Sequence, residues 1–160
     1  MKIEDAIQQK TFISEHQKAL INLLYTSGQV LSNNTRILRP YNISQQQFNI
    51  LRILRGMHPQ PATVKLLTER MLDKMSNASR LVEKLKQKDC VERIPCEDDR
   101  RRVDISITDK GLRLVAEASE AIESDMEKIH SVLTKEEALQ LSDLLDKVRA
   151  HEVLKADNEK

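Results

Sequence analysis

The chain has 160 residues, of which 32% are charged and 2% aromatic, with three glycines, four prolines and no tryptophan. This length suits a single domain or one module with a helical extension, and so few Gly and Pro residues favour a mostly helical fold. The sequence lacks an apolar run of membrane-spanning length and a signal-peptide core, and two cysteines exclude a disulfide framework. We therefore expect a cytoplasmic protein with no membrane partner.

The formal net charge of +1 is unevenly distributed. Residues 1–116 are net basic, whereas residues 117–160 are net acidic. Such a division suits a protein that presents a basic surface to DNA and keeps an acidic surface away from it, although acidic faces are also common on ordinary solvated helices.

A long first helix is predicted from Ser14 to Arg39. Ser14 begins a capping-box pattern with Gln17, and Pro40 disfavours helical geometry at the residue before it. Leucines recur along one stripe of this helix, at Leu20, Leu24, Leu31 and Leu38. Residues 1–13 are ambiguous and could form a short helix or a partly ordered arm.

Two shorter helices are predicted next. Ser44, with Gln47 three residues later, marks the start of the second helix, and the two prolines of residues 58–61 end it. Thr63 is the predicted N-cap of a short third helix. With a turn at residues 72–73, this third helix is the supporting helix of a helix-turn-helix, and the helix after the turn is its recognition helix.

The recognition helix is predicted over residues 74–88, after the turn at residues 72–73. Its apolar residues recur at helical spacing and form one face: Met75, Ala78, Leu81, Val82 and Leu85. The remaining side chains include short polar or cationic groups: Lys74, Ser76, Asn77, Ser79, Arg80 and Lys84. Groups of this kind on a helix can enter a DNA major groove and reach base edges and phosphates.

A basic hairpin is predicted after this helix. Side chains alternate with period two on both sides of the segment 96–102, at Val91 and Arg93 and again at Val103, Ile105 and Ile107. The tip of the hairpin carries Arg100, Arg101 and Arg102. A helix that can enter a groove, followed by a hairpin with a cationic tip, is the outline of a winged helix-turn-helix.

Two long helices are predicted at the C-terminal end. Thr108 caps the longest helix, and Thr134 caps the last one, with Glu137 as its capping-box partner. Residues 150–160 are expected to fray. Both helices carry an apolar stripe that the wing and the recognition helix cannot cover if they face DNA, so we expect a second copy of the chain to cover it in a homodimer.

At these residues the sequence resembles the multiple-antibiotic-resistance regulator (MarR) family of bacterial transcription factors. The resemblance includes Asp99-Arg100-Arg101, the alternating strand after it, and Thr108-Asp109-Lys110-Gly111, which matches a Thr-x-x-Gly pattern that opens the next helix. Residues 76–82 and Leu85 resemble the family's recognition helix. The resemblance covers nearly the whole chain in the order and length of its elements.

The sequence departs from the family pattern at two positions. Asp89 stands where the family usually has a glycine in left-handed conformation, and Cys90 stands where it often has a leucine. Asp adopts the left-handed conformation more readily than most residues do. We therefore expect both departures to be compatible with the fold.

The resemblance implies a mostly α fold with a small β-wing, in which a winged helix-turn-helix core is joined to long N- and C-terminal dimerisation helices. It divides the chain into residues 1–40, which contribute to dimerisation, residues 41–110, which bind DNA, and residues 111–160, which form the C-terminal dimerisation helices. It also implies a sequence-specific regulator, acting as a repressor on a pseudo-palindromic operator and relieved by a phenolic or other aromatic acid.

Roles for individual residues are expected from their chemistry and from where they lie in this arrangement, and the place of Arg101 from the family's wing motif. Base and backbone contacts are expected from Ser76, Asn77, Ser79 and Arg80, and phosphate contacts from Lys65, Lys74, Lys84 and Lys86. Arg101, aided by Arg100 or Arg102, is expected to enter the minor groove, while Asp99 orients the wing. An effector pocket could be lined by His16, Tyr25, Arg39 and Tyr41, each of which could equally be a core or surface residue.

The sequence offers little support for an enzyme or a metal site. No nucleophile elbow, P-loop or metal-protease motif occurs, and the four histidines lack metal-ligand spacing, so neither an enzyme nor a cofactor is expected. A winged helix used for protein–protein contact is one alternative, although the arginine-rich wing favours DNA. A redox-responsive regulator acting through Cys96 is another, whereas Cys90 is expected to be a small buried hydrophobic residue.

Overall fold

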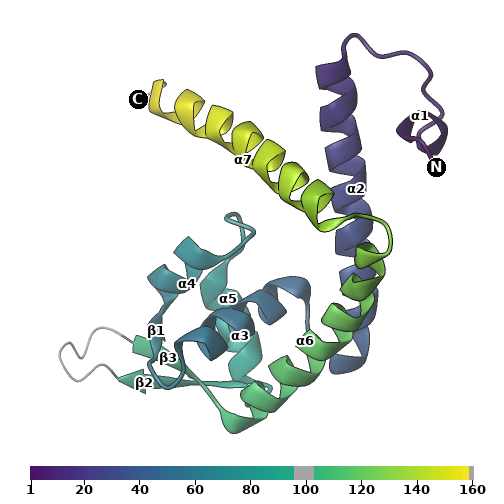
Figure 1. The fold of residues 1–160 in the computed structure, drawn as a ribbon. Coiled ribbons are helices and arrows are strands. Elements are labelled where there is room, and N and C mark those ends of the chain that lie inside the picture. The colour runs from purple at the N-terminus through teal and green to yellow at the C-terminus, as the bar shows by residue number, and fades with distance from the viewer. Residues whose placement is uncertain (96–102, 159–160) are drawn as a thin grey trace. The chain divides into compact units, whose positions relative to one another are not determined.

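The computed structural model describes residues 1–95 and 103–158 (Figure 1). In chain order the elements are α1 (Ile3–Ala6), α2 (Glu15–Leu38), a 3₁₀ turn η1 (Arg39–Tyr41), α3 (Gln45–Met57), β1 (Ala62–Thr63), α4 (Val64–Arg70), α5 (Ala78–Lys86), β2 (Val91–Pro95), β3 (Val103–Ile107), α6 (Asp109–His130) and α7 (Lys135–Asn158). The chain is thus mostly helical with a small antiparallel sheet, which confirms the predicted fold class. It forms two compact units, Met1–Ser119 and Glu120–Lys160.

Side-chain caps set the helix starts where the sequence predicts them. In α3, the Ser44 hydroxyl accepts the N–H of Gln47 at 3.2 Å, and the Gln47 side chain accepts the N–H of Ser44 at 3.0 Å. The Thr134 and Glu137 pair does the same at the start of α7. Together these bonds satisfy backbone donors that a helix terminus would otherwise leave unpaired.

The cap of α2 differs slightly from the predicted one. Ser14 accepts the N–H of Gln17 at 3.2 Å, as predicted, but the Gln17 side chain accepts the N–H of Ile13 instead of that of Ser14. The helix ends at Leu38, with Arg39 as its C-cap, which agrees with the predicted end. The ambiguous residues 1–13 include the short helix α1.

The sheet has one strand more than the predicted hairpin. Its order is β1-β3-β2, and β1 adds Ala62 opposite Ile105 and Thr63 opposite Asp104. A strand of two residues is too short to show an alternating pattern, so periodicity could not reveal it. Thr63 also caps α4, because its hydroxyl accepts the N–H of Leu66 at 3.1 Å.

The core of the first unit is built around α3. Figure 1 shows α3, α4 and α5 gathered beside the strands. The fully buried side chains come from each of these elements and from the neighbouring helices, and include Leu38, Ile50, Leu51, Leu54, Leu67, Val82, Leu85, Ile105 and Val115. Burial of this apolar surface is the main stabilising contribution to the winged core.

A closely packed junction joins the end of α5 to the start of α6. Asp89 has φ 57°, which confirms the left-handed conformation expected at this position. The Thr108 hydroxyl donates to the Asp89 carbonyl at 2.7 Å and accepts the N–H of Gly111 at 3.1 Å. Cys90 is 1% exposed, as expected for a small buried residue.

The last helix is longer than predicted. Fraying was expected from Ala150, but α7 continues as a helix to Asn158. The segment consists largely of good helix formers such as Ala, Glu, Leu and Lys and has no Gly or Pro to stop it. In the described part of the chain, no helix has a stretch long and apolar enough to cross a membrane.

The junction leads to a stability prediction for Gly111. A Cβ added there would lie 2.1 Å from the Cys90 carbonyl oxygen and 2.8 Å from Ile107 Cγ1. Because a backbone carbonyl cannot move aside as a flexible side chain can, we expect Gly111→Ala to lower the free energy of unfolding by about 2 kcal/mol. Urea denaturation at a fixed protein concentration measures this change.

Gly56→Ala is the matched control. Gly56 lies in α3, and a Cβ there would have nothing within 4 Å. Alanine is the better helix former, so this variant should be more stable than wild type by about 0.5–1 kcal/mol. Equal denaturation midpoints for Gly111→Ala and wild type would contradict the close approach at the junction.

Candidate nucleic-acid interface

The helix α5 has a buried face and an exposed polar face. Ala78, Val82 and Leu85 are buried, and α5 packs against α3, α4 and β2. The side chains of Ser79, Arg80 and Lys84 are exposed. Since the apolar face is used in the core, the polar face is the one that α5 offers to a partner.

The predicted start of this helix was wrong. The sequence pattern placed residues 74–77 on the helix, but α5 begins at Ala78, and Asn77 is its N-cap. The Asn77 side-chain oxygen accepts the N–H of Arg80 at 2.9 Å. Met75 is 94% exposed and is not part of the apolar face. Asn is among the preferred N-cap residues, and here the cap outweighs the apolar spacing.

A turn organised by Asp73 precedes the helix. The Asp73 carboxylate accepts the N–H of Met75 at 3.0 Å and the hydroxyl of Ser76 at 2.7 Å. Both hydrogen bonds lower the pKa of Asp73, and the one from Ser76 has the larger effect. The Lys74 ammonium donates to the Glu69 carbonyl at the end of α4. Lys74 and Ser76, both predicted as helix positions facing DNA, therefore also hold this turn in place.

Sequence reasoning missed this role of Asp73. The signal was available, because Asp bonds readily to the backbone two residues ahead and so favours turns over helix interiors. Asn77, which follows four residues later, is a typical N-cap residue as well. Read together, the two residues indicate a turn and then a helix.

The strands of the wing are fixed to the recognition helix. In β2 and β3, Val91 pairs with Ile107 and Arg93 with Ile105. The Arg93 guanidinium lies 3.1 Å from the Glu83 carboxylate of α5. The predicted wing residues Asp99, Arg100, Arg101 and Arg102, and the predicted redox residue Cys96, lie outside the described residues.

The buried Cys90 does not have the features of a reactive thiol. Burial raises its pKa, and the nearby Lys110 and Lys88 only partly oppose this effect. A raised pKa disfavours the thiolate, which is the reactive form. Among the described residues, no three His, Cys, Asp or Glu side chains come together as a metal site requires.

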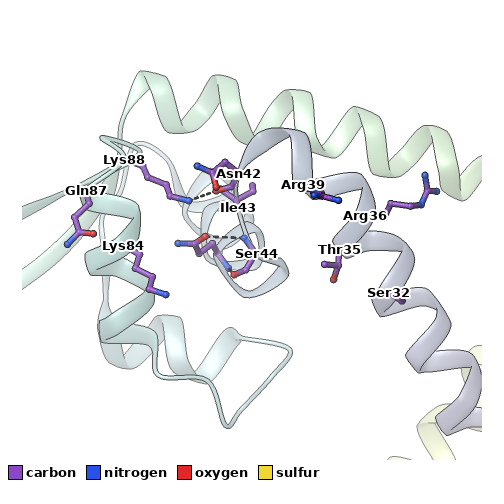
Figure 2. Close-up of a pocket in the computed structure, with 11 residues that line it drawn as sticks. Ser32, Thr35, Arg36, Arg39, Asn42, Ile43, Ser44, Lys84, Gln87 and Lys88 are labelled. Atoms are coloured by element: carbon purple, nitrogen blue, oxygen red, sulfur yellow. Dashed lines mark hydrogen bonds between the residues drawn. The ribbon is translucent and has the colours of Figure 1, made fainter.

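A cavity of about 750 Å³ lies between α2, the start of α3 and the end of α5 (Figure 2). Its lining residues are Ser32, Thr35, Arg36, Arg39, Asn42, Ile43, Ser44, Gln47, Lys84, Gln87 and Lys88. Of the four residues considered for an effector pocket, Arg39 lines this cavity. The Tyr41 hydroxyl instead donates to the Glu117 carbonyl at 3.3 Å, and neither His16 nor Tyr25 is among the lining residues.

Comparisons with known proteins agree with this geometry. The model of the MarR family matches residues 41–102. The HTH-type transcriptional regulator PecS of Dickeya dadantii is 31% identical over 118 residues, which cover 72% of this chain and 70% of PecS. The HTH-type transcriptional regulator MgrA of Staphylococcus aureus is 34% identical over 116 residues, which cover 72% of this chain and 76% of MgrA.

A solved structure extends the likeness to most of the fold. The crystal structure of NadR in complex with 4-hydroxyphenylacetate has a TM-score of 0.67 and is 25% identical to this chain. The match covers 87% of this chain and 97% of NadR. The exposed polar face of α5, the wing strands and these likenesses lead to one conclusion: the chain belongs to the MarR family of winged helix-turn-helix transcription regulators, which bind DNA and are not enzymes.

Proposed function

We propose that this chain is a cytoplasmic homodimeric repressor that binds a pseudo-palindromic operator. The proposal rests on one observation above all, the exposed polar and cationic face of α5 opposite its buried face. In this proposal, residues 41–110 bind DNA, and residues 1–40 and 111–160 form the dimer. The recognition helix α5 enters the major groove, and the wing enters the minor groove.

The roles proposed for individual residues follow from their chemistry and position. Arg80 reads a base edge, since arginine pairs well with guanine, and Ser79 lies beside it in the first turn of α5. Asn77 and Ser76 contact DNA from the segment just before the helix. Phosphate contacts come from Lys84 and, further away, from Lys65, Lys74 and Lys86. Arg100, Arg101 and Arg102 form the cationic tip of the wing, which Asp99 orients.

Apolar side chains left exposed in the single chain support dimerisation. On α2, Leu20, Leu24 and Leu31 are exposed. On α7, Leu141, Leu144 and Val148 lie on one stripe, and each is at least 40% exposed. A second copy would remove this surface from water, which is favourable at about 25 cal/mol per Å². A two-fold dimer would present its recognition helices to successive major grooves about 34 Å apart.

Control by a phenolic or other aromatic acid is the last part of the proposal. The structure of NadR in complex with 4-hydroxyphenylacetate supports it, because NadR shares the fold and that ligand is a phenolic acid. Such a ligand would act by binding preferentially to the dimer conformation that does not fit the operator.

Operator binding tests the proposal directly. DNA from upstream of the chain's own coding region should bind saturably in the presence of nonspecific competitor and more weakly as salt increases. Arg80→Ala and Arg101→Ala should each lower the affinity by about tenfold or more, since one good base contact contributes about 1–3 kcal/mol. Fluorescence anisotropy over a salt titration gives both the affinity and the salt slope.

Arg113→Ala serves as the control because Arg113 is an exposed arginine on α6, outside the proposed DNA surface. If it weakened binding as much as Arg80→Ala, the assignment of α5 would be wrong. If no preferred sequence emerged even from a selection on random DNA, the alternative of a winged helix for protein–protein contact would replace the operator model.

Substitutions of Asn77 separate its structural role from its DNA contact. Asn77→Ala removes the N-cap of α5 and should cost about 1 kcal/mol of stability, whereas Asn77→Ser keeps a capping oxygen and should cost much less. If Asn77 also contacts a base, both variants should bind the operator more weakly by a similar factor. Full operator affinity in Asn77→Ser would restrict Asn77 to the cap.

Substitutions on α7 test the proposed dimer. Leu144→Glu places a charge in the apolar stripe and should convert the dimer to monomers at micromolar concentration in sedimentation experiments. Leu139→Glu is the matched control, because Leu139 is an exposed leucine on the opposite side of the same helix. A wild-type chain that sediments as a monomer at this concentration would refute the dimer outright.

A further inference from the structure

The cavity between α2, α3 and α5 is lined by an unusual set of charges. Four of its lining residues are cationic, Arg36, Arg39, Lys84 and Lys88, and none of the described lining residues is Asp or Glu. In Figure 2, Lys84 extends from α5 toward the cavity. Arg36, at the end of α2, and Arg39, in η1, lie on the opposite side, and the end of the Arg36 side chain is turned away from Lys84. The whole chain is nearly neutral, with 26 Lys and Arg against 25 Asp and Glu. The lining of the cavity is therefore far more positively charged than the chain as a whole.

Among the described residues, no salt bridge joins any of these four cations to an acidic side chain. Ion pairs elsewhere in the described part of the chain join Lys18 to Glu4, Arg93 to Glu83 and Lys110 to Asp89, but none involves the four cavity residues. Arg36 instead donates to the Asn33 side chain at 2.7 Å, and Lys88 donates to the Asn42 carbonyl. Like charges gathered around one space repel each other and create a positive potential there, which attracts an anion.

The first turn of α3 adds to this potential. Ser44, the N-cap of α3, and Gln47 in its first turn both line the cavity. The Ser44–Gln47 capping box satisfies two backbone donors at this terminus, but the partial positive charge of a helix of 13 residues that begins at the cavity wall still favours an anion there. The cations and the helix terminus thus act in the same direction.

The lining also indicates what kind of anion fits. Among the described lining residues none is aromatic, and Ile43 is the one large aliphatic residue. Several anionic oxygens would find several cations here, and a phenolic ring would find no aromatic side chain to stack against. We propose that this cavity binds a small polyanion that carries two or more phosphate or carboxylate groups, at a site separate from that of any aromatic effector.

Occupancy of this site would oppose DNA binding. Lys84 lines the cavity and is also a phosphate contact in the proposed operator complex. One ammonium cannot serve a bound polyanion and a DNA phosphate equally at the same time, so each ligand should weaken the other by the same factor. This consequence rests on the proposed function, whereas binding of the polyanion does not.

Tripolyphosphate is a suitable probe for the full-length protein. Isothermal titration at constant ionic strength should show saturable binding to wild type, and the Arg36→Gln/Arg39→Gln double variant should bind at least tenfold more weakly. The control Arg113→Gln, an exposed arginine on another helix, should stay within twofold of wild type. Absence of saturable binding, or equal affinity in all three proteins, would overturn the proposal.

A second experiment measures operator binding with and without tripolyphosphate. It distinguishes a free polyanion from the DNA backbone as the source of the phosphates. Without the probe, the double variant should bind operator DNA as wild type does, and tripolyphosphate should weaken operator binding by wild type at least tenfold more than by the variant. If the double variant lost DNA affinity as severely as Arg80→Ala, the cations would serve the DNA backbone and the proposal would be wrong. If tripolyphosphate bound as expected but no operator did, the polyanion site would stand and the proposed function would fail.

Discussion

The backbone carbonyl of Cys90 is the contact on which the geometry of the winged core depends. It accepts the N–H of Thr108 at 3.1 Å, and Gly111 approaches it so closely that a Cβ would lie 2.1 Å away. The left-handed Asp89 turns the chain toward this point from the end of α5. Because α5 ends just before the junction and α6 begins just after it, one buried junction sets how the recognition helix, the wing strands and α6 are joined.

The junction acts together with polar contacts between α6 and the elements before it. The Tyr41 hydroxyl donates to the Glu117 carbonyl, and Arg55 of α3 donates to the buried hydroxyl of Ser119 at 3.2 Å. Both bonds join α6 to the elements before it, and the one to the buried Ser119 hydroxyl is the more costly to break. A movement of the winged core must therefore either carry the start of α6 along with it or exchange these partners.

How far the sequence predicts this structure depends on the range of the interactions involved. The capping boxes of α3 and α7 were predicted because each depends on two residues that are close in sequence. The left-handed Asp89 was expected from the family resemblance. The start of α5 was missed because the turn at Asp73 competes with apolar spacing, and β1 was missed because it exists only through its pairing with β3. The cavity could not be found at all, since residues 32–47 and residues 84–88 come together only in the folded chain.

Lys84 shows why the candidate site cannot be divided into one residue for each role. It lies in the last turn of α5, where a cation interacts favourably with the helix dipole, and it also lines the cavity and is proposed to contact a DNA phosphate. A change at Lys84 would therefore alter helix stability, anion binding and DNA affinity together. Arg36 lies on α2 and Arg39 on the 3₁₀ turn η1 that follows it. Both are away from the recognition helix in sequence and share only the cavity with it. Variants of these two arginines are therefore the ones that can separate regulation from recognition.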